Sequence, residues 1–196
     1  FMHMKKYIAL LFAFLAFAAL VFSPNVAAQE VESAQASTPT IVAYDLPFPG
    51  ILPDHSLYKL KVLRDKIMLW LTTNPKSKAD LYLLLTDKGM LATAMLVDKN
   101  QIVLAKQTAL KAEHNYTLLT QELYRFGEKP TAEYFVKLKT AAAKHQEVLG
   151  SLADRVSPED ATTFHVVIDF SKRNVQSIEE YQKKRLFEKL PEDLLP

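Results

Sequence analysis

The chain has 196 residues, of which 49% are hydrophobic and 23% charged, and its formal net charge is +2. This composition supports one packed domain and argues against wholesale disorder. The absence of Cys excludes disulfides, thiolate metal sites and Cys nucleophiles. Lys5 and Lys6 supply the whole positive excess, since 22 basic and 22 acidic residues remain from Gln29 onward. A neutral body has no overall attraction for nucleic acid or anionic lipid, so we expect no nucleic-acid partner.

Residues 1–28 have the pattern of a secretory signal peptide. Two lysines precede an apolar run at 7–22, residues 23–25 interrupt it, and small residues lead to a cleavage site after Ala28. An uncleaved membrane anchor is the alternative, although 16 residues are fewer than the usual 17–25 of a spanning helix. Both alternatives place the rest of the chain outside the cytoplasm, as a secreted or cell-envelope protein.

The remaining chain divides into a polar flexible linker at 29–43, a helical domain at 44–190 and a short tail at 191–196. Prolines separate long stretches in which apolar residues recur every three or four positions, and no alternating strand pattern is present. We therefore predict an all-α bundle of about five amphipathic helices, preceded by a proline-stiffened extended arm.

The first helix is predicted over Asp54 to Thr72, with the Asp54 carboxylate as its N-cap. Trp70 is expected in the core. One apolar face is expected to pack on the bundle: Leu57, Leu60, Leu63, Ile67 and Leu71.

The second helix is predicted over Pro75 to Asp98, with Asn74 as its cap and Pro75 at its first position. Gly89 lies inside it and should weaken it by about 1 kcal/mol relative to Ala. Six residues are expected to form its core face: Leu81, Leu84, Leu85, Leu91, Met95 and Leu96.

Asn100 is expected to end this helix in a left-handed conformation, and the third helix then runs over Gln101 to Phe126 and ends at Gly127. The fourth helix is predicted from Pro130 to Ala153. Its core positions are Tyr134, Phe135, Leu138, Ala142, Val148, Leu149 and Leu152.

The last helix has the clearest start signal, with Ser157 as cap and Pro158 at the first position, and runs to Leu186 or Leu190. Its core positions are Phe164, Ile168, Val175 and Ile178. Its end, residues 179–190, is amphipathic and basic, which is typical of a solvated helix end with Lys and Arg at the negative pole of the dipole. A helix that contacts a membrane surface or a partner is the alternative.

The arm before the first helix is stiffened by Pro47, Pro49 and Pro53 and is too apolar for a free linker. One interpretation is a packed arm that lies along the bundle. The other is an interaction arm for a partner, formed by Tyr44, Leu46, Phe48, Ile51, Leu52 and Tyr58.

The stretch from Tyr44 to Lys61, followed by Leu63-Arg64-Asp65-Lys66, Asn74-Pro75 and Lys78 to Leu85, resembles a bacterial domain-of-unknown-function family, family 5667. The resemblance covers Tyr44 to Leu96 and rests on the family's LPDSPLY-x-LK motif, which reads LPDHSLYKLK at 52–61 here, and on its DP-x-x-KA second helix, which reads NPKSKA at 74–79. It implies an exported or envelope helical protein without an assigned chemistry or carried-over site residues. The chain departs from the family at Lys88-Gly89, where an Arg is usual.

Residues that could carry chemistry are few. The sequence has no G-x-S-x-G, P-loop or G-x-G-x-x-G motif. His165 and Asp169 have the spacing of a helical ligand pair, and His145 is more typical of packing than of catalysis. Four acids lie among Lys or Gln neighbours and are interpreted as solvated: Asp87, Asp98, Glu113 and Glu122.

These observations favour an exported, non-enzymatic α-helical protein that contacts an unknown protein or the cell envelope, with no catalytic, cofactor or metal residue assigned. Membrane contact is expected only through an uncleaved leader or weakly through the C-terminal helix. An extracytoplasmic bundle that binds a small ligand or metal, with His145 or His165 involved, is the alternative. An enzyme of unfamiliar type is a third hypothesis.

Overall fold

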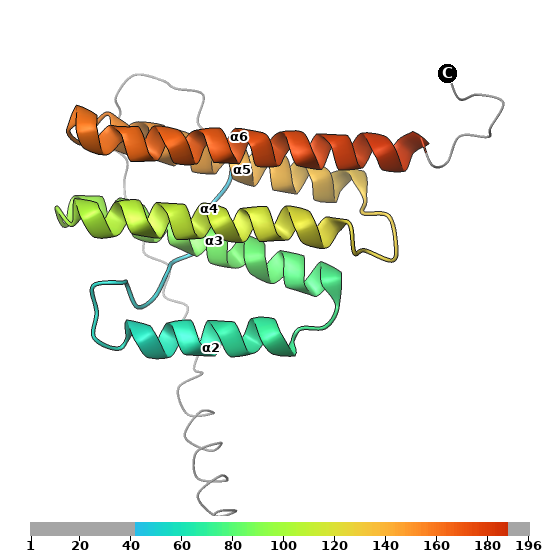
Figure 1. Ribbon diagram of the computed structural model, residues 1–196, viewed down its shortest axis with the longest axis horizontal. Coiled ribbons are helices and arrows are strands. Elements are labelled where there is room, and N and C mark those ends of the chain that lie inside the picture. The colour runs from blue at the N-terminus through green and yellow to red at the C-terminus, as the bar shows by residue number, and fades with distance from the viewer. Residues whose placement is uncertain (1–41, 188–196) are drawn as a thin grey trace, which may run out of the picture. The chain divides into compact units, whose positions relative to one another are not determined.

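The computed structural model describes residues 42–187. The signal peptide predicted at 1–28, most of the linker at 29–43 and the tail at 191–196 lie outside the described residues. Within the described range the chain forms five α-helices and no β-strand, which confirms the predicted all-α bundle (Figure 1). The helices are α2 (Tyr58–Leu71), α3 (Pro75–Asp98), α4 (Ile102–Leu123), α5 (Ala132–Ala153) and α6 (Pro158–Phe187).

Two helices begin as the sequence predicts. The Asn74 side chain accepts a hydrogen bond from the backbone N–H of Ser77 at 3.0 Å, and Pro75 is the first residue of α3. The Ser157 hydroxyl accepts from the backbone N–H of Asp160 at 3.2 Å at the start of α6. Side-chain oxygens therefore satisfy amide groups that the first turn of each helix leaves unpaired.

The structure corrects the boundaries of α4 and α5. α5 begins after Thr131, whose side chain accepts a backbone hydrogen bond of the first turn at 3.3 Å, so Pro130 precedes the helix. α4 ends at Leu123, before the predicted terminator Gly127. The early end lets the chain turn so that Phe126 enters the core, where it is 8% exposed.

Asp54 is not the cap of the first helix. α2 begins at Tyr58, and no side chain caps its N-terminus at Leu57. The Asp54 carboxylate instead accepts a hydrogen bond from Nζ of Lys99 at 2.8 Å, and Nε2 of Gln101 lies at 3.4 Å. The hydrogen bond from Lys99 holds the pKa of Asp54 below its usual value. Asp54 therefore ties the segment before α2 to the loop between α3 and α4.

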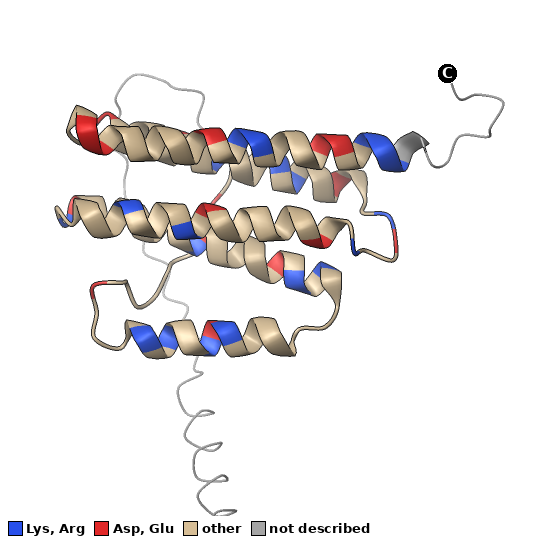
Figure 2. Ribbon diagram, viewed as in Figure 1, with Lys and Arg blue, Asp and Glu red and all other residues tan. Residues whose placement is uncertain are grey.

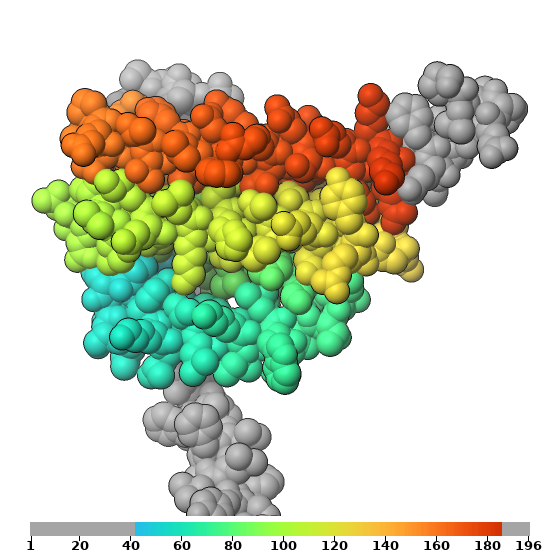
Figure 3. Space-filling model, in the orientation of Figure 1, coloured from blue at the N-terminus to red at the C-terminus, as the bar shows by residue number. Residues whose placement is uncertain are grey.

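Four helices form the bundle. α3 and α4 make one helical hairpin, closed at Asn100, whose φ of 56° confirms the predicted left-handed terminator. α5 and α6 make a second hairpin, and the two hairpins meet where α4 contacts α6 and α3 contacts α5. α2 lies along the outside as a further layer (Figures 1 and 3). It has no comparably close backbone packing with any other described helix.

The core runs between the two hairpins. The predicted faces of α5 and α6 are confirmed in their main positions, since Phe135, Leu138, Leu149, Phe164 and Ile178 are all buried. Burying one such side chain stabilises the fold by about 1.5–3 kcal/mol.

Of the six core positions predicted for α3, only Leu96 is buried, whereas four are partly buried: Leu81, Leu85, Leu91 and Met95. Leu84 is 39% exposed, whereas its neighbour Leu83 is 2% exposed and belongs to the core. Gly89 of the same helix marks the close approach of α3 to α4. A Cβ atom built at Gly89 would lie 2.6 Å from Cβ of Ala112, so the two helices could not pack as they do around a larger residue.

Candidate functional site

The outward side of α2 is apolar and exposed. Trp70 is 79% exposed and Leu57 is 50% exposed, so the predictions that put Trp70 and the Leu57 stripe in the core are wrong. No residue of α2 is buried. We define the α2 face as the five exposed apolar residues that share this side of the helix: Leu60, Leu63, Ile67, Trp70 and Leu71.

The orientation of α2 has a simple cause, because the helix is apolar on two sides. Tyr58, Val62 and Leu69 are partly buried and line the space between α2 and the bundle. At about 100° per residue, these three lie opposite Leu63 and Ile67. The predicted stripe is therefore a real helical stripe, but the other apolar side covers the bundle.

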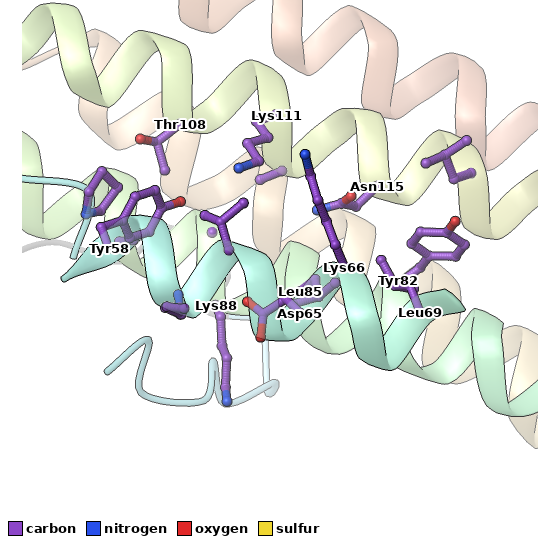
Figure 4. A pocket seen from close by; sticks show the side chains of 17 residues that line it. Tyr58, Asp65, Lys66, Leu69, Tyr82, Leu85, Lys88, Thr108, Lys111 and Asn115 are labelled. Atoms are coloured by element: carbon purple, nitrogen blue, oxygen red, sulfur yellow. The ribbon is translucent and has the colours of Figure 1, made fainter. Parts of the chain in front are cut away.

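A cavity of about 200 Å³ lies between α2, α3 and α4 (Figure 4). Its lining combines apolar side chains with Asp65 and four lysines: Lys61, Lys66, Lys88 and Lys111. Nζ of Lys61 and Nζ of Lys111 lie 5.4 and 5.6 Å from the ring centroid of Tyr58, within the range of cation–π attraction. Partial burial lowers the pKa of Lys61. Such a lining suits an apolar molecule that carries a negative charge.

The beginning of the arm is fastened to the bundle. The Tyr44 hydroxyl donates to Oδ2 of Asp87 on α3 at 2.7 Å. The other carboxylate oxygen, Oδ1, lies 2.7 Å from Nε2 of His145 on α5. The backbone N–H of Val42 donates to Oε2 of Glu147 at 2.9 Å. Partial burial raises the pKa of Tyr44, which keeps its hydroxyl a donor.

The other arm residues separate into two groups. Leu46 packs against the core and Leu52 is 7% exposed, so both serve to anchor the arm. Phe48 is 68% exposed and Ile51 is 39% exposed, and both line a shallow hollow together with the start of α2. Tyr58 lies in the α2 cavity. The structure thus brings Phe48 and Ile51 to α2 and turns the rest of the set toward the bundle.

Three of the four acids interpreted as solvated are buried. Asp87 is 4% exposed, Glu113 2% and Glu122 7%, and only Asp98 of the four is exposed. The partner of Asp87, His145, is 58 residues away along the chain, so no local pattern could reveal the pair. The clue that the sequence did offer was a His on an apolar face, which requires a polar partner.

The Asp87–His145 pair resembles a catalytic dyad, but its buried position is more typical of a pair that stabilises the fold. His145 is fully buried, and the ring of Tyr116 meets it edge-on with centroids 5.7 Å apart. A general base must reach the proton that it abstracts. The pair instead joins α3, α5 and the arm at Tyr44.

Glu113 of α4 is a second buried carboxyl group. Nδ2 of Asn174 on α6 donates to its Oε1 at 2.7 Å. Burial raises the pKa of Glu113 to about 7, and the Asn174 hydrogen bond offsets only part of that effect. A hollow of about 410 Å³ between α4 and α6 includes both residues, with Leu110 and Phe170 at its edge.

The predicted ligand pair, His165 and Asp169, is exposed on α6. Within residues 42–187, no three His, Asp or Glu side chains are grouped so that they could hold a metal ion. The same part of the chain contains no helix that is both long and apolar enough to span a membrane. At the C-terminal end of α6, Ile178 and Tyr181 are buried in the core.

A comparison with protein families matches residues 50–159 to the family described as "Domain of unknown function (DUF5667)". The match extends from the arm through α2, α3, α4 and α5 to the first residues of α6, well beyond the motifs that carry the resemblance in the sequence. Comparisons with curated proteins and with solved structures gave no match. Because the matched region covers more than half of the chain, this protein belongs to the DUF5667 family.

Proposed function

We propose that this chain is an exported, non-enzymatic α-helical protein that uses the α2 face to contact another protein or the cell envelope. The signal-peptide pattern of residues 1–28 supports export. The position of the buried Asp87–His145 pair, which joins three parts of the fold, favours a structural role for the most catalytic-looking residues.

The observation that carries this proposal is the concentration of exposed apolar side chains. Sixteen large apolar residues are exposed in the described part of the chain, and nine of them fall within residues 48–71. The other seven are scattered over α3, α4, α5, α6 and the turn that follows α4. Soluble monomers seldom keep a contiguous apolar patch exposed unless it takes part in binding. The α2 face and the neighbouring Phe48 and Ile51 therefore form the best candidate interaction surface.

Site-specific photocrosslinking in the native envelope tests the proposal. A photoreactive residue at Leu63, on the α2 face, should form defined adducts. The matched control is Val136 on α5, which is 59% exposed against 55% for Leu63. Adducts at position 136 but none at 63 would overturn the proposal.

A second candidate function is binding of a small amphiphilic anion in the cavity between α2 and the bundle. Its volume of about 200 Å³ and its four lysines favour this alternative, and neither His145 nor His165 is among its lining residues. Octanoate should raise the melting temperature of the protein, and Val62→Trp, which fills the cavity, should abolish the shift. An equal shift in both proteins would place any binding elsewhere, and no shift would remove the hypothesis.

A further inference from the structure

The charged residues of α2 are arranged around the α2 face. At about 100° per residue, Lys59 and Lys66 follow one edge of the apolar side, and Arg64 follows the other. The acid of this helix, Asp65, is turned inward, where its side chain is 15% exposed and pairs with Arg64 at 2.7 Å. Figure 2 shows the same excess of basic over acidic residues along α2. The neutrality of the chain from Gln29 onward thus conceals a local positive strip.

A shallow hollow of about 430 Å³ continues the α2 face toward the arm. Apolar side chains form one part of it: Phe48, Ile51, Leu57 and Leu60. Lys61, Arg64 and Lys88 supply positive charge, and no acid is among the residues that line it. An anionic headgroup beside an acyl chain offers the chemistry that matches this pairing.

Aromatic side chains lie at both ends of the surface. Trp70 belongs to the last turn of α2 and is 79% exposed, and Phe48 lies at the opposite end in the arm. Aromatic rings are favoured at the boundary between headgroups and acyl chains. A 14-residue helix is about 21 Å long, so it would lie in that boundary and would not cross the bilayer.

The positive charges along the edges of the α2 face also favour a bilayer over a second copy of the chain as its partner. A second copy of the chain, packed α2 against α2, would bring Lys59, Lys66 and Arg64 close to the same residues of its partner. Like charges in such an interface are unfavourable. A bilayer that contains acidic lipids supplies negative charge along both edges and apolar volume between them. α2 is the outermost layer on its side of the bundle (Figures 1 and 3), so a flat surface can reach it.

We propose that the α2 face, with Phe48 and Ile51, docks on the surface of a bilayer that contains anionic lipids. This inference rests on the proposed function and names the partner of the same surface. It assigns membrane contact to α2 instead of the C-terminal helix, where Ile178 and Tyr181, within the part whose side chains the structure describes, are already buried in the core. The exposed Lys59 and Lys66 provide the main electrostatic attraction, each strengthening binding by roughly fivefold near an anionic surface. Lys61 is partly buried and Arg64 is paired with Asp65, so both contribute less.

Because Trp70 is the only Trp of the chain, its fluorescence tests membrane contact at α2 specifically. Trp70 is on the α2 face, and the apolar segment 7–22 contains no Trp, so fluorescence of the full chain reports α2 even where another segment tethers the protein. Vesicles of phosphatidylcholine with phosphatidylglycerol should shift Trp70 emission to the blue, and brominated acyl chains should quench it. Phosphatidylcholine alone should do neither. Added salt should weaken the response to the anionic vesicles.

Two pairs of variants identify the surface. Leu63→Glu should weaken the Trp70 response at least tenfold, because it removes apolar area that docking would bury in the bilayer and adds a negative charge. Val136→Glu, at an equally exposed site on α5, should leave the response unchanged. Lys59→Gln with Lys66→Gln should reduce the affinity for anionic vesicles roughly 25-fold, whereas Lys76→Gln with Lys172→Gln should not. Circular dichroism establishes that each variant is folded.

Three results would overturn the lipid inference. They are equal responses to neutral and anionic vesicles, no quenching by brominated lipid, and equal effects of Leu63→Glu and Val136→Glu. If one of these occurs while position 63 still crosslinks to a protein in the envelope, the proposed interaction function survives with a protein partner. A dimer in sedimentation that Leu63→Glu dissociates would identify a second copy as the occupant. Loss of both the vesicle response and the crosslinks would remove both proposals.

Discussion

α2 and α5 are both amphipathic helices of the same domain, yet the fold uses them in opposite ways. α5 turns its apolar residues inward, and Phe135, Leu138 and Leu149 are at most 1% exposed. α2 buries no residue and keeps Leu60 and Trp70 in solvent. The comparison teaches that an apolar stripe identifies a surface that needs a partner, while the partner itself is decided by the rest of the fold.

The comparison is tested most directly by the same substitution in the two regions. Leu138→Ala should lower the free energy of unfolding by about 2–5 kcal/mol, because it leaves a cavity in the core. Leu60→Ala should change it by less than about 0.5 kcal/mol, because the side chain is 63% exposed. Urea unfolding followed by circular dichroism measures both values. Similar losses in the two variants would show that α2 packs through its outward face.

The bundle also contains a buried carboxyl group that should make the stability of the protein depend on pH. The pKa of Glu113 is about 7 in the folded protein, whereas the ordinary pKa of a Glu side chain, which applies to the unfolded chain, is 4.5. The folded state therefore retains the proton between these two pH values. Stability should therefore fall as pH rises from 4.5 to 7, by up to about 3 kcal/mol, and this contribution should be fully regained below 4.5.

Glu113→Gln keeps an oxygen to accept the hydrogen bond from Asn174 and removes this titration. Its unfolding free energy should be flatter over that pH range than that of the wild type. Glu179→Gln, at an exposed site of α6, controls for the loss of one negative charge. An unchanged slope in Glu113→Gln would assign the pH dependence to another group.

The contact between α3 and α4, on which α2 lies, can be loosened by one methyl group. Gly89→Ala places a Cβ 2.6 Å from that of Ala112 and should destabilise the domain by about 1–3 kcal/mol through overpacking. Gly150→Ala on α5 is the matched control. Apart from the backbone of its own helix and its chain neighbours, no atom lies within 4 Å of its new Cβ, so this variant should gain about 0.5–1 kcal/mol. Thermal melts in which both variants shifted the melting temperature in the same direction would contradict the close contact between Gly89 and Ala112.

A smaller effect than in the core is expected at the arm. Tyr44→Phe removes the hydroxyl that donates to Asp87 and should lower the free energy of unfolding by about 1 kcal/mol. Trp70 emission of the folded protein should not change, because the Tyr44–Asp87–His145 contact fastens the arm to α3 and α5 and not to α2. A change in Trp70 emission without a loss of stability would mean that the arm positions α2.

Much of the fold could be predicted from local signals. Asn74-Pro75 and Ser157-Pro158 mark the starts of α3 and α6, because capping and the fixed φ of proline act within one turn. The inward face of α5 follows from its single apolar stripe. α2 could not be oriented in this way, since Tyr58, Val62 and Leu69 offer a second stripe and no local interaction chooses between the two.

The candidate site was only partly visible in the sequence. Phe48 and Ile51 belong to the predicted interaction arm, but the sequence did not separate them from Leu46 and Leu52, which pack on the bundle. Trp70 was expected in the core because large apolar residues are usually buried. The burial of Asp87 and Glu113 depends on His145 and Asn174, which are 58 and 61 residues away. Contacts of that range arise from the packing of whole helices and leave no trace in neighbouring residues.

The two bonds that hold the start of the arm have a mechanical consequence. Val42 is bonded to Glu147 on α5, and Tyr44 is bonded to Asp87 on α3. A pulling force applied to the chain ahead of residue 42 would therefore load these two helices before it reached α2. The bundle would bear the tension first, and α2 would stay unloaded until these two bonds broke.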